Sequence, residues 1–201
     1  MAFFFSTPRL TVRPWRERDR PDLERMATDL DMMRFVTGRA WPADQIDEFL
    51  TRQQRHIRNH GVCFGAVELA ERMQVVGVVG MQPLDGTDFR GDFELGWWIW
   101  KDFWGQGLAL EAITPFVTHA RNMGLKRVLA VIDPPNSASI RWPRSSACTS
   151  SERSAPARPL PPATTSRPAC TRWIWRRPER GLARLVGRRF FPAPERSRAA
   201  P

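Results

Sequence analysis

The sequence has no tyrosine, three histidines and three cysteines. Cys63, Cys148 and Cys170 lack the paired CxxC spacing of zinc sites, and an odd number of scattered cysteines is typical of free thiols in a reducing compartment. No apolar run approaches the roughly 20 residues that a membrane-spanning helix needs. The start of the chain also lacks the basic segment of a signal peptide. These absences predict a cytoplasmic protein with no metal site and no membrane span.

The net charge of +10 belongs to one end of the chain. Residues 142–201 carry 13 Arg, no Lys and 3 acidic residues, whereas residues 1–141 carry 18 basic and 18 acidic residues. The segment 142–201 is rich in Pro and Arg and has apolar islands only at 173–175 and 182–191, so it is expected to be disordered. Nucleic-acid binding is the alternative interpretation of its arginines, but no recognition motif accompanies them.

Hydrophobic patterning over residues 1–141 predicts a domain in which strands and helices alternate. Strands are expected at 9–15, 62–69, 74–81, 93–100 and 127–133, and helices at 21–33, from about 43 to a stop at Gly61, and at 107–123. The nearly continuous apolar run at 74–81 is typical of a central strand covered on both faces. The order of elements predicts a mixed α/β sheet.

The stretch 94–112 carries the clearest chemistry, because a strand leads through a glycine-containing turn directly into a helix. Such a turn aims backbone N–H groups along the helix dipole, where a pyrophosphate binds well. Gly105 and Gly107 let the backbone approach phosphates without a Cβ in the way, and Ala109 keeps the first helical turn close to the ligand. Taken alone the motif is weak, because many strand-to-helix turns contain two glycines for backbone reasons.

Five motifs in a fixed order are more specific than one. They are Thr-Pro-Arg-Leu-Thr-Val-Arg-Pro-Trp at 7–15, Val-Gly-Val-Val-Gly at 76–80, Glu-Leu-Gly-Trp-Trp-Ile at 94–99, the loop at 104–109, and Asn136 with Ser139. This arrangement resembles the Gcn5-related N-acetyltransferase (GNAT) superfamily, and within it the branch of ribosomal-protein-alanine N-acetyltransferases. The resemblance implies a mixed, mostly antiparallel central sheet flanked by helices.

The resemblance also implies an activity. An enzyme of this kind transfers acetyl from acetyl-CoA to a primary amine, a protein N-terminus or a small amine, by direct attack in a ternary complex. It uses no metal, acts on no membrane or nucleic acid, and can be a homodimer. An inactive relative of the family is the alternative.

The residues that match the family motifs receive expected roles. Glu94 corresponds to an acidic residue that acts as the base, directly or through water, although a surface or salt-bridged strand carboxylate is an equal alternative. The backbone of Trp98, Ile99 and Trp100 would bond the pantetheine arm as an added strand does. Asn136 would reach the pantetheine, and Ser137 would replace the family's tyrosine as proton donor or simply cap a helix. Ser139, like Asn136, matches the start of the family's last helix at the cofactor site. The backbone amides of the glycine-containing loop would hold the pyrophosphate; the loop residues are Trp104, Gly105, Gln106, Gly107, Leu108 and Ala109.

After Arg141 the chain departs from the family, which continues with a helix ending in Glu-Lys-Leu-Gly and two strands. Restoring one G before the codon for Trp142 can yield Val-Ala-Glu-Lys-Leu-Gly-Leu-His-Phe-Glu, the expected continuation. We therefore expect an acetyltransferase domain at 1–141 that is incomplete at its C-terminus, followed by an out-of-frame tail at 142–201 in place of the last helix and strands. Low stability and weak activity follow, whereas a genuine basic tail is the alternative.

Overall fold

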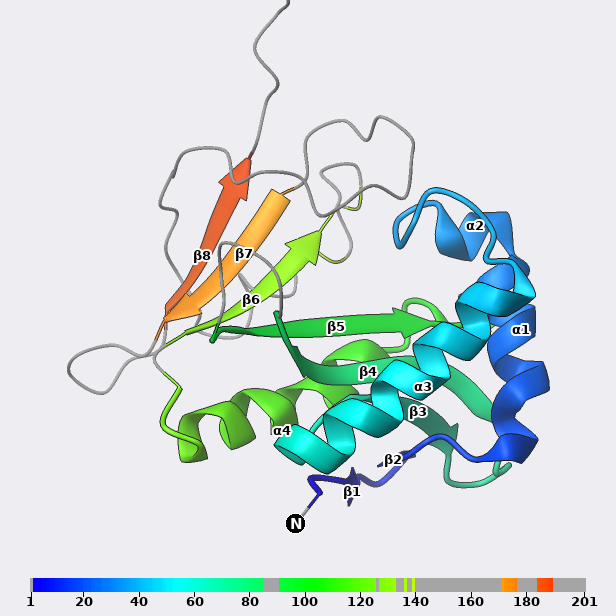
Figure 1. The fold of residues 1–201 in the computed structure, drawn as a ribbon, viewed down its shortest axis with the longest axis horizontal. Helices are drawn as coiled ribbons and strands as arrows, with labels where there is room; N and C mark the ends of the chain where they lie inside the picture. Colours follow the sequence, from blue (N-terminus) through cyan, green and yellow to red (C-terminus); the bar gives the residue numbers. More distant parts are fainter. Residues whose placement is uncertain are drawn as a thin grey trace, which may run out of the picture.

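The structure is a computed structural model that describes residues 2–84, 91–125, 127–132, 136, 139, 171–176 and 184–189 (Figure 1). Its strands are β1 (Phe5–Ser6), β2 (Leu10–Arg13), β3 (Phe64–Leu69), β4 (Val75–Pro83), β5 (Phe93–Ile99), β6 (Arg127–Ile132), β7 (Thr171–Arg176) and β8 (Arg184–Arg189). Its helices are η1 (Glu17–Asp19), α1 (Arg20–Thr28), α2 (Leu30–Met33), α3 (Ala43–His60), η2 (Lys101–Phe103) and α4 (Leu108–Asn122).

The strands form one sheet whose spatial order follows the chain from β1 to β8. Within the described residues each neighbouring pair is antiparallel except β5 and β6, which run parallel. Parallel neighbours need a long crossover connection, and α4 supplies it here. The sheet is therefore the mixed, mostly antiparallel one that the resemblance implied.

Helices cover both faces of this sheet (Figure 1). The apolar side of α4 packs on one face, where Phe116 joins Val79 in a buried cluster. The helices α1 to α3 pack on the opposite face, where Phe49 joins Val78 in a second cluster. Val78 and Val79 are adjacent in β4 and enter different clusters, because successive side chains of a strand point to opposite faces.

The elements of residues 9–132 lie close to their predicted positions. As predicted, Gly61 ends α3: it follows His60 as the C-cap and adopts the left-handed backbone conformation, with φ of 71°. The single helix predicted at 21–33 is two helices instead. Asp29 leaves the helical conformation, and its carboxylate accepts a hydrogen bond from the Met32 N–H at 3.0 Å, so it caps α2.

A buried ion-pair network ties β2 and β3 to the start of the helical layer. The Arg13 guanidinium donates to Asp19 at 2.6 and 2.9 Å and to Glu68 at 3.1 Å. These hydrogen bonds, the one to Asp19 above all, raise the pKa of Arg13 in spite of its burial. Burial by itself would raise the pKa of Asp19, but hydrogen bonds from Arg13 and from the Arg16 N–H outweigh it and lower that pKa. Arg13 and Asp19 are therefore both charged at neutral pH.

The structure differs from the sequence-based expectation in two parts of the tail. The strands β7 and β8 coincide with the apolar islands, and β7 pairs with all six residues of β6. An uncovered edge of β6 would leave backbone N–H and C=O groups unpaired, which explains why an added hairpin is favourable there. The expectation of disorder at 142–170, 177–183 and 190–201 lies outside the described residues.

Candidate functional site

The parallel strands β5 and β6 form a fork. They pair at two positions only within the described residues, Phe93 with Val128 and Glu94 with Leu129, and then diverge toward their C-terminal ends (Figure 1). The other edge of β5 pairs with β4 along its whole length, from Phe93 to Ile99. The sheet is thus continuous on one side of β5 and open on the other beyond Glu94.

An ion pair closes the root of this fork. Arg127 begins β6, and Asp92 immediately precedes β5. The guanidinium donates from Nε to Oδ1 at 2.8 Å and from Nη2 to Oδ2 at 2.6 Å, in the bidentate arrangement that gives such pairs their strength. The hydrogen bond to Asp92 raises the pKa of Arg127. The two strands are therefore fastened together where they start.

The direction of the backbone groups of β5 decides which of them face the opening. The Trp100 N–H donates to the Val76 carbonyl at 2.7 Å, so Trp100 is bonded to β4. Bonded and non-bonded positions alternate in an antiparallel pair, which means that Trp98 also turns its N–H and C=O toward β4. Of Trp98, Ile99 and Trp100, which were expected to bond the pantetheine together, Ile99 alone directs its backbone groups toward the fork. Its carbonyl accepts the Trp104 indole N–H at 2.5 Å.

The glycine-containing loop follows the open end of β5 and leads into α4. Gly105 and Gly107 adopt φ of 76° and 75°, in the left-handed region that favours glycine. A Cβ built on Gly105 would meet no atom of the described residues within 4 Å, so these residues leave that face of the loop open. Gly107 caps α4, whose first amides have no partner within the helix. These residues fit an oxyanion such as a pyrophosphate at the helix N-terminus.

The structure adds a contact to this loop that sequence reasoning missed. Glu111, in the first turn of α4, accepts hydrogen bonds from the Thr7 hydroxyl at 2.5 Å and from Arg9 Nε at 2.7 Å. Arg9 Nη1 also donates to the Gln106 carbonyl at 3.0 Å. Burial by itself would raise the pKa of Glu111, but the bonds from Thr7 and Arg9 outweigh it and lower that pKa. Thr7 and Arg9 lie in a motif that identified the family resemblance, where no role was given to them.

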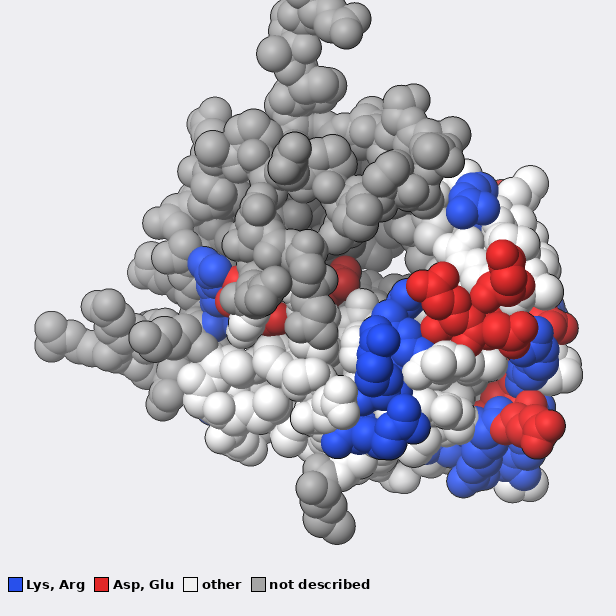
Figure 2. Space-filling model, in the orientation of Figure 1, with Lys and Arg blue, Asp and Glu red and all other residues white. Residues whose placement is uncertain are grey.

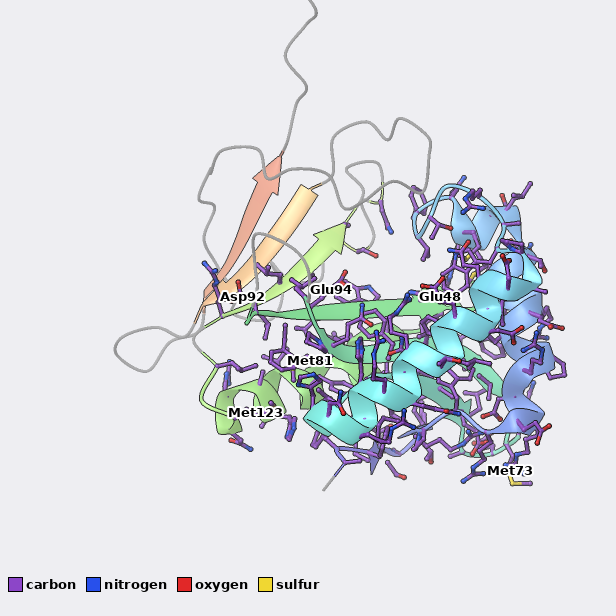
Figure 3. All side chains as sticks on the ribbon, in the orientation of Figure 1. Glu48, Met73, Met81, Asp92, Glu94 and Met123 are labelled. Atoms are coloured by element: carbon purple, nitrogen blue, oxygen red, sulfur yellow. The ribbon has the colours of Figure 1, made fainter. Side chains whose placement is uncertain are left out.

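The candidate base Glu94 lies at the root of the fork, beside Asp92 at the same end of β5 (Figure 3). Its carboxylate accepts a hydrogen bond from Gln82 Nε2 at 3.3 Å. Gln82 faces Gln53 of α3, which is 1% exposed and whose Oε1 accepts the Phe64 N–H at 2.9 Å. Glu94 is half-buried, so it has fixed neighbours and remains within reach of solvent.

Aromatic residues line the same face of β5 as Glu94. Trp98 packs with Trp41 and Phe49, at ring-centroid distances of 5.1 and 5.7 Å. Gly96 lies between Glu94 and Trp98, and the Phe64 ring occupies the place where its Cβ would be, 2.6 Å from Cζ. This glycine therefore makes room for a ring. Trp41, Trp98 and Trp100 thus belong to the apolar cluster on the α1–α3 side.

Asn136 and Ser139 are described individually. Asn136 Oδ1 accepts the Ser139 N–H at 3.1 Å, the three-residue spacing of a helix cap. The structure thus brings this pair together in a capping contact. Ser137 lies outside the described residues.

Surface charge follows the polarity of α3. Basic side chains form a stripe over its C-terminal half and acidic side chains gather over its N-terminal half (Figure 2). The basic residues include Arg52, Arg55 and Arg58, and the acidic ones include Asp44 and Glu48. This distribution complements the helix dipole.

Within the part of the chain that the structure describes, no three His, Cys, Asp or Glu side chains gather as metal ligands do. In the same part, no helix is both long and apolar enough to cross a bilayer.

Known proteins share this fold. The first is an acetyltransferase from Agrobacterium tumefaciens strain C58, with a TM-score of 0.65 and 20% identity over 74% of this chain and 85% of that one. The second is YncA from Salmonella typhimurium, solved with its cofactor acetyl-CoA, with a TM-score of 0.53 and 19% identity over 68% and 77% of the two chains. The third is RimL, a ribosomal L7/L12 alpha-N-protein acetyltransferase, with a TM-score of 0.58 and 16% identity over 74% and 82%.

The sequence itself matches a family model. The match covers residues 9–146, more than half of the chain, and the model describes an acetyltransferase (GNAT) domain. The matched region contains the fork, the glycine loop and the start of α4. The chain therefore belongs to the GNAT acetyltransferase family.

Proposed function

We propose that this protein transfers the acetyl group of acetyl-CoA to a primary amine by direct attack in a ternary complex. One observation carries the proposal: the open side of β5 leads directly into a loop with two left-handed glycines at the N-terminus of a helix. The open strand edge suits a peptide-like arm, and the loop suits a diphosphate, which are the two parts of CoA in that order.

The chain's own groups suggest how the donor would be held. Ile99 directs its N–H and C=O into the fork, so its backbone would bond the amides of the pantetheine arm. The Ile99 carbonyl would have to exchange the Trp104 indole for this partner, or share it. The amides from Trp104 to Ala109 would hold the diphosphate, and Asn136 would contact the arm. YncA, which has a similar fold, was solved with acetyl-CoA, and this supports the choice of donor.

Glu94 is the proposed proton acceptor. An amine must lose a proton to attack a thioester, and a carboxylate within reach directly or through one water can accept it. Gln82 holds the Glu94 carboxylate on the face of β5 that also carries Trp98. The acceptor would approach from this α1–α3 side. Ser137 is proposed to protonate the leaving thiolate, because the sequence has no tyrosine.

Isothermal titration with CoA and a thiol-release assay with acetyl-CoA test this proposal. The acceptors tested should include peptides with free N-termini, because RimL is an alpha-N-protein acetyltransferase. They should also include small amines, because the proposed acceptor is any primary amine. Saturable CoA binding with amine-dependent thiol release is the expected result. A chain that binds no CoA would refute the proposed function.

Glu94→Gln tests the base separately, and Glu48→Gln is its matched control. Glu48 lies on α3, where its side chain is 75% exposed (Figure 3). Loss of a general base lowers kcat by about 10²- to 10⁴-fold, with little change in the Kd for CoA. Glu48→Gln should change neither. Unchanged kcat in Glu94→Gln would assign Glu94 to the structural role that the sequence left open.

We further propose that residues 142–201 are read out of frame, so that the acetyltransferase domain is 1–141 and incomplete. The family match ends at residue 146, five residues after Arg141, which supports a break there. The nucleotide sequence across the Arg141 codon tests this, because codons incompatible with the restored reading would exclude it. A frame-restored chain should be more soluble and more active than this one, and equal activity would count against the proposal.

A further inference from the structure

Arg9 and Glu111 join three separate segments around the glycine loop. Arg9 precedes β2, Glu111 belongs to the first turn of α4, and the Gln106 carbonyl belongs to the loop between β5 and α4. Arg9 contacts both of the others through different nitrogens, with Nη2 at 2.5 Å from Glu111 Oε2. An arginine side chain presents its donors in a rigid plane, so this double contact fixes the guanidinium relative to the loop.

The contact to the Gln106 carbonyl has a geometric consequence. The peptide unit is planar and trans, so the Gln106 C=O and the Gly107 N–H point in opposite directions. Because Arg9 draws the carbonyl toward β2, the Gly107 N–H must point away from Arg9. The Gly107 carbonyl is also fixed, since it accepts the Glu111 N–H at 3.0 Å. Both peptide units around Gly107 are thus held, and with them the direction of its amide.

Glycine needs such support at this position. Gly107 has φ of 75° and, lacking a side chain, reaches the right-handed region about as easily. Among the residues that the structure describes, a Cβ built on it would find Arg9 Nη2 at 3.9 Å and no other atom within 4 Å, so their packing does not fix its conformation. The hydrogen bond from Arg9 to the Gln106 carbonyl and the one from the Glu111 N–H to the Gly107 carbonyl supply that restriction.

We propose that Arg9 is a positioning residue that aims the Gly107 amide at the diphosphate of the donor, with Glu111 holding Arg9 in place. This inference rests on the proposed function. It assigns no contact between Arg9 and the substrate. Arg9 prearranges a donor group that would otherwise have to be ordered when the ligand binds.

The test compares a donor that contains the diphosphate with one that lacks it. Arg9→Met removes the guanidinium and its hydrogen-bond donors but keeps most of the aliphatic part of the side chain, and Arg9→Lys keeps the positive charge. Arg20→Met is the control, because Arg20 also pairs with carboxylates, but those carboxylates, Glu24 and Asp47, belong to α1 and α3 and not to the loop or α4. The readouts are the Kd for CoA, and kcat and KM for acetyl-CoA and for S-acetylpantetheine.

In Arg9→Met we expect the Kd for CoA and the KM for acetyl-CoA to rise about tenfold, the effect of one hydrogen bond of ordinary strength. The kcat and the KM for S-acetylpantetheine should not change, because that donor has no diphosphate. Arg9→Lys should resemble Arg9→Met, since a lysine cannot hold both partners in one plane. Arg20→Met should match the unsubstituted chain in every readout.

Other outcomes overturn the inference. Full CoA affinity in Arg9→Lys would mean that charge alone matters, and equal losses with both donors would mean a general structural role. If Arg9→Met does not fold, Glu111→Gln replaces it, because the amide can still accept from Thr7 but has no charge to hold Arg9. A Kd within twofold of the unsubstituted chain in that variant also overturns the inference. Absence of CoA binding in the unsubstituted chain instead refutes the proposed function.

Discussion

The Asp92 carboxylate and the Arg127 guanidinium form a bidentate ion pair at the root of the fork, next to the two residue pairs that join β5 to β6. Arg127→Met should lower the free energy of unfolding by about 1.5–3 kcal/mol, the range for hydrogen bonds to charged groups. CoA should also bind more weakly, because the strands that would flank the pantetheine arm in the proposed function are no longer fastened. Urea unfolding and titration calorimetry measure the two effects, and unchanged CoA affinity would show that the root does not set the fork.

Gly105 permits a test that separates backbone strain from blocked binding. Gly105 and Gly124 have φ of 76° and 75°, and a Cβ on either would meet no atom within 4 Å in the described part of the chain. Alanine should therefore cost each site a similar amount of stability, about 1–2 kcal/mol for a left-handed residue. Only Gly105→Ala should weaken CoA binding, because its methyl group would enter the proposed phosphate site. Equal CoA affinity in both variants would contradict the loop assignment.

The buried network of Arg13 predicts a large loss of stability. Arg13→Met removes the buried cation between Asp19 and Glu68 and leaves them with the exposed Arg18, at 4.0 and 3.7 Å. Breaking a buried ion pair costs about 3–5 kcal/mol. Urea unfolding measures this loss. Arg20→Met, at a largely exposed ion pair, should leave the free energy of unfolding nearly unchanged. A small loss in Arg13→Met would mean that the carboxylates find other partners or water.

His119 makes stability depend on pH. Its ring stacks on Phe3 at a centroid distance of 3.8 Å, and burial lowers the pKa of His119 below its ordinary 6.5. As pH falls below 6.5 the unfolded chain gains a proton that the folded chain resists, so stability decreases until the folded-state pKa is passed. His119→Phe keeps a ring against Phe3, and it should show a smaller decrease between pH 8 and pH 5. Parallel curves for both proteins would show that His119 does not contribute.

Local signals were enough to predict most of the fold. The end of α3 at Gly61 and the glycine-containing turn before α4 each depend on residues that are neighbours in the sequence, and both are found in the structure. The break at Asp29 was missed because the apolar spacing of a helix continues across it. What ends the helix there is the extended ψ of Asp29, 116°, with which its side chain accepts the Met32 N–H. The strand β7 was missed because its stability comes from the edge of β6, a partner that lies about 40 residues earlier.

The supporting contacts of the candidate site were beyond sequence reasoning for the same reason. Arg9 and Glu111 are 102 residues apart, and Gln82 meets Glu94 only because β4 and β5 pair in one register. Backbone direction is a further example. The sequence placed Trp98, Ile99 and Trp100 together, but the alternation that turns Ile99 alone toward the fork is fixed by the bond between Trp100 and Val76.

The closed root of the fork gives the site a natural length limit. From Ile99 back to Glu94 the open edge of β5 spans five residues, about 16 Å of extended strand, before pairing with β6 begins. An arm that starts at the loop and runs along this edge ends where the strands meet. A propionyl or butyryl group in place of acetyl would push against paired backbone. The spacing between loop and root would then act as a ruler that selects short acyl chains.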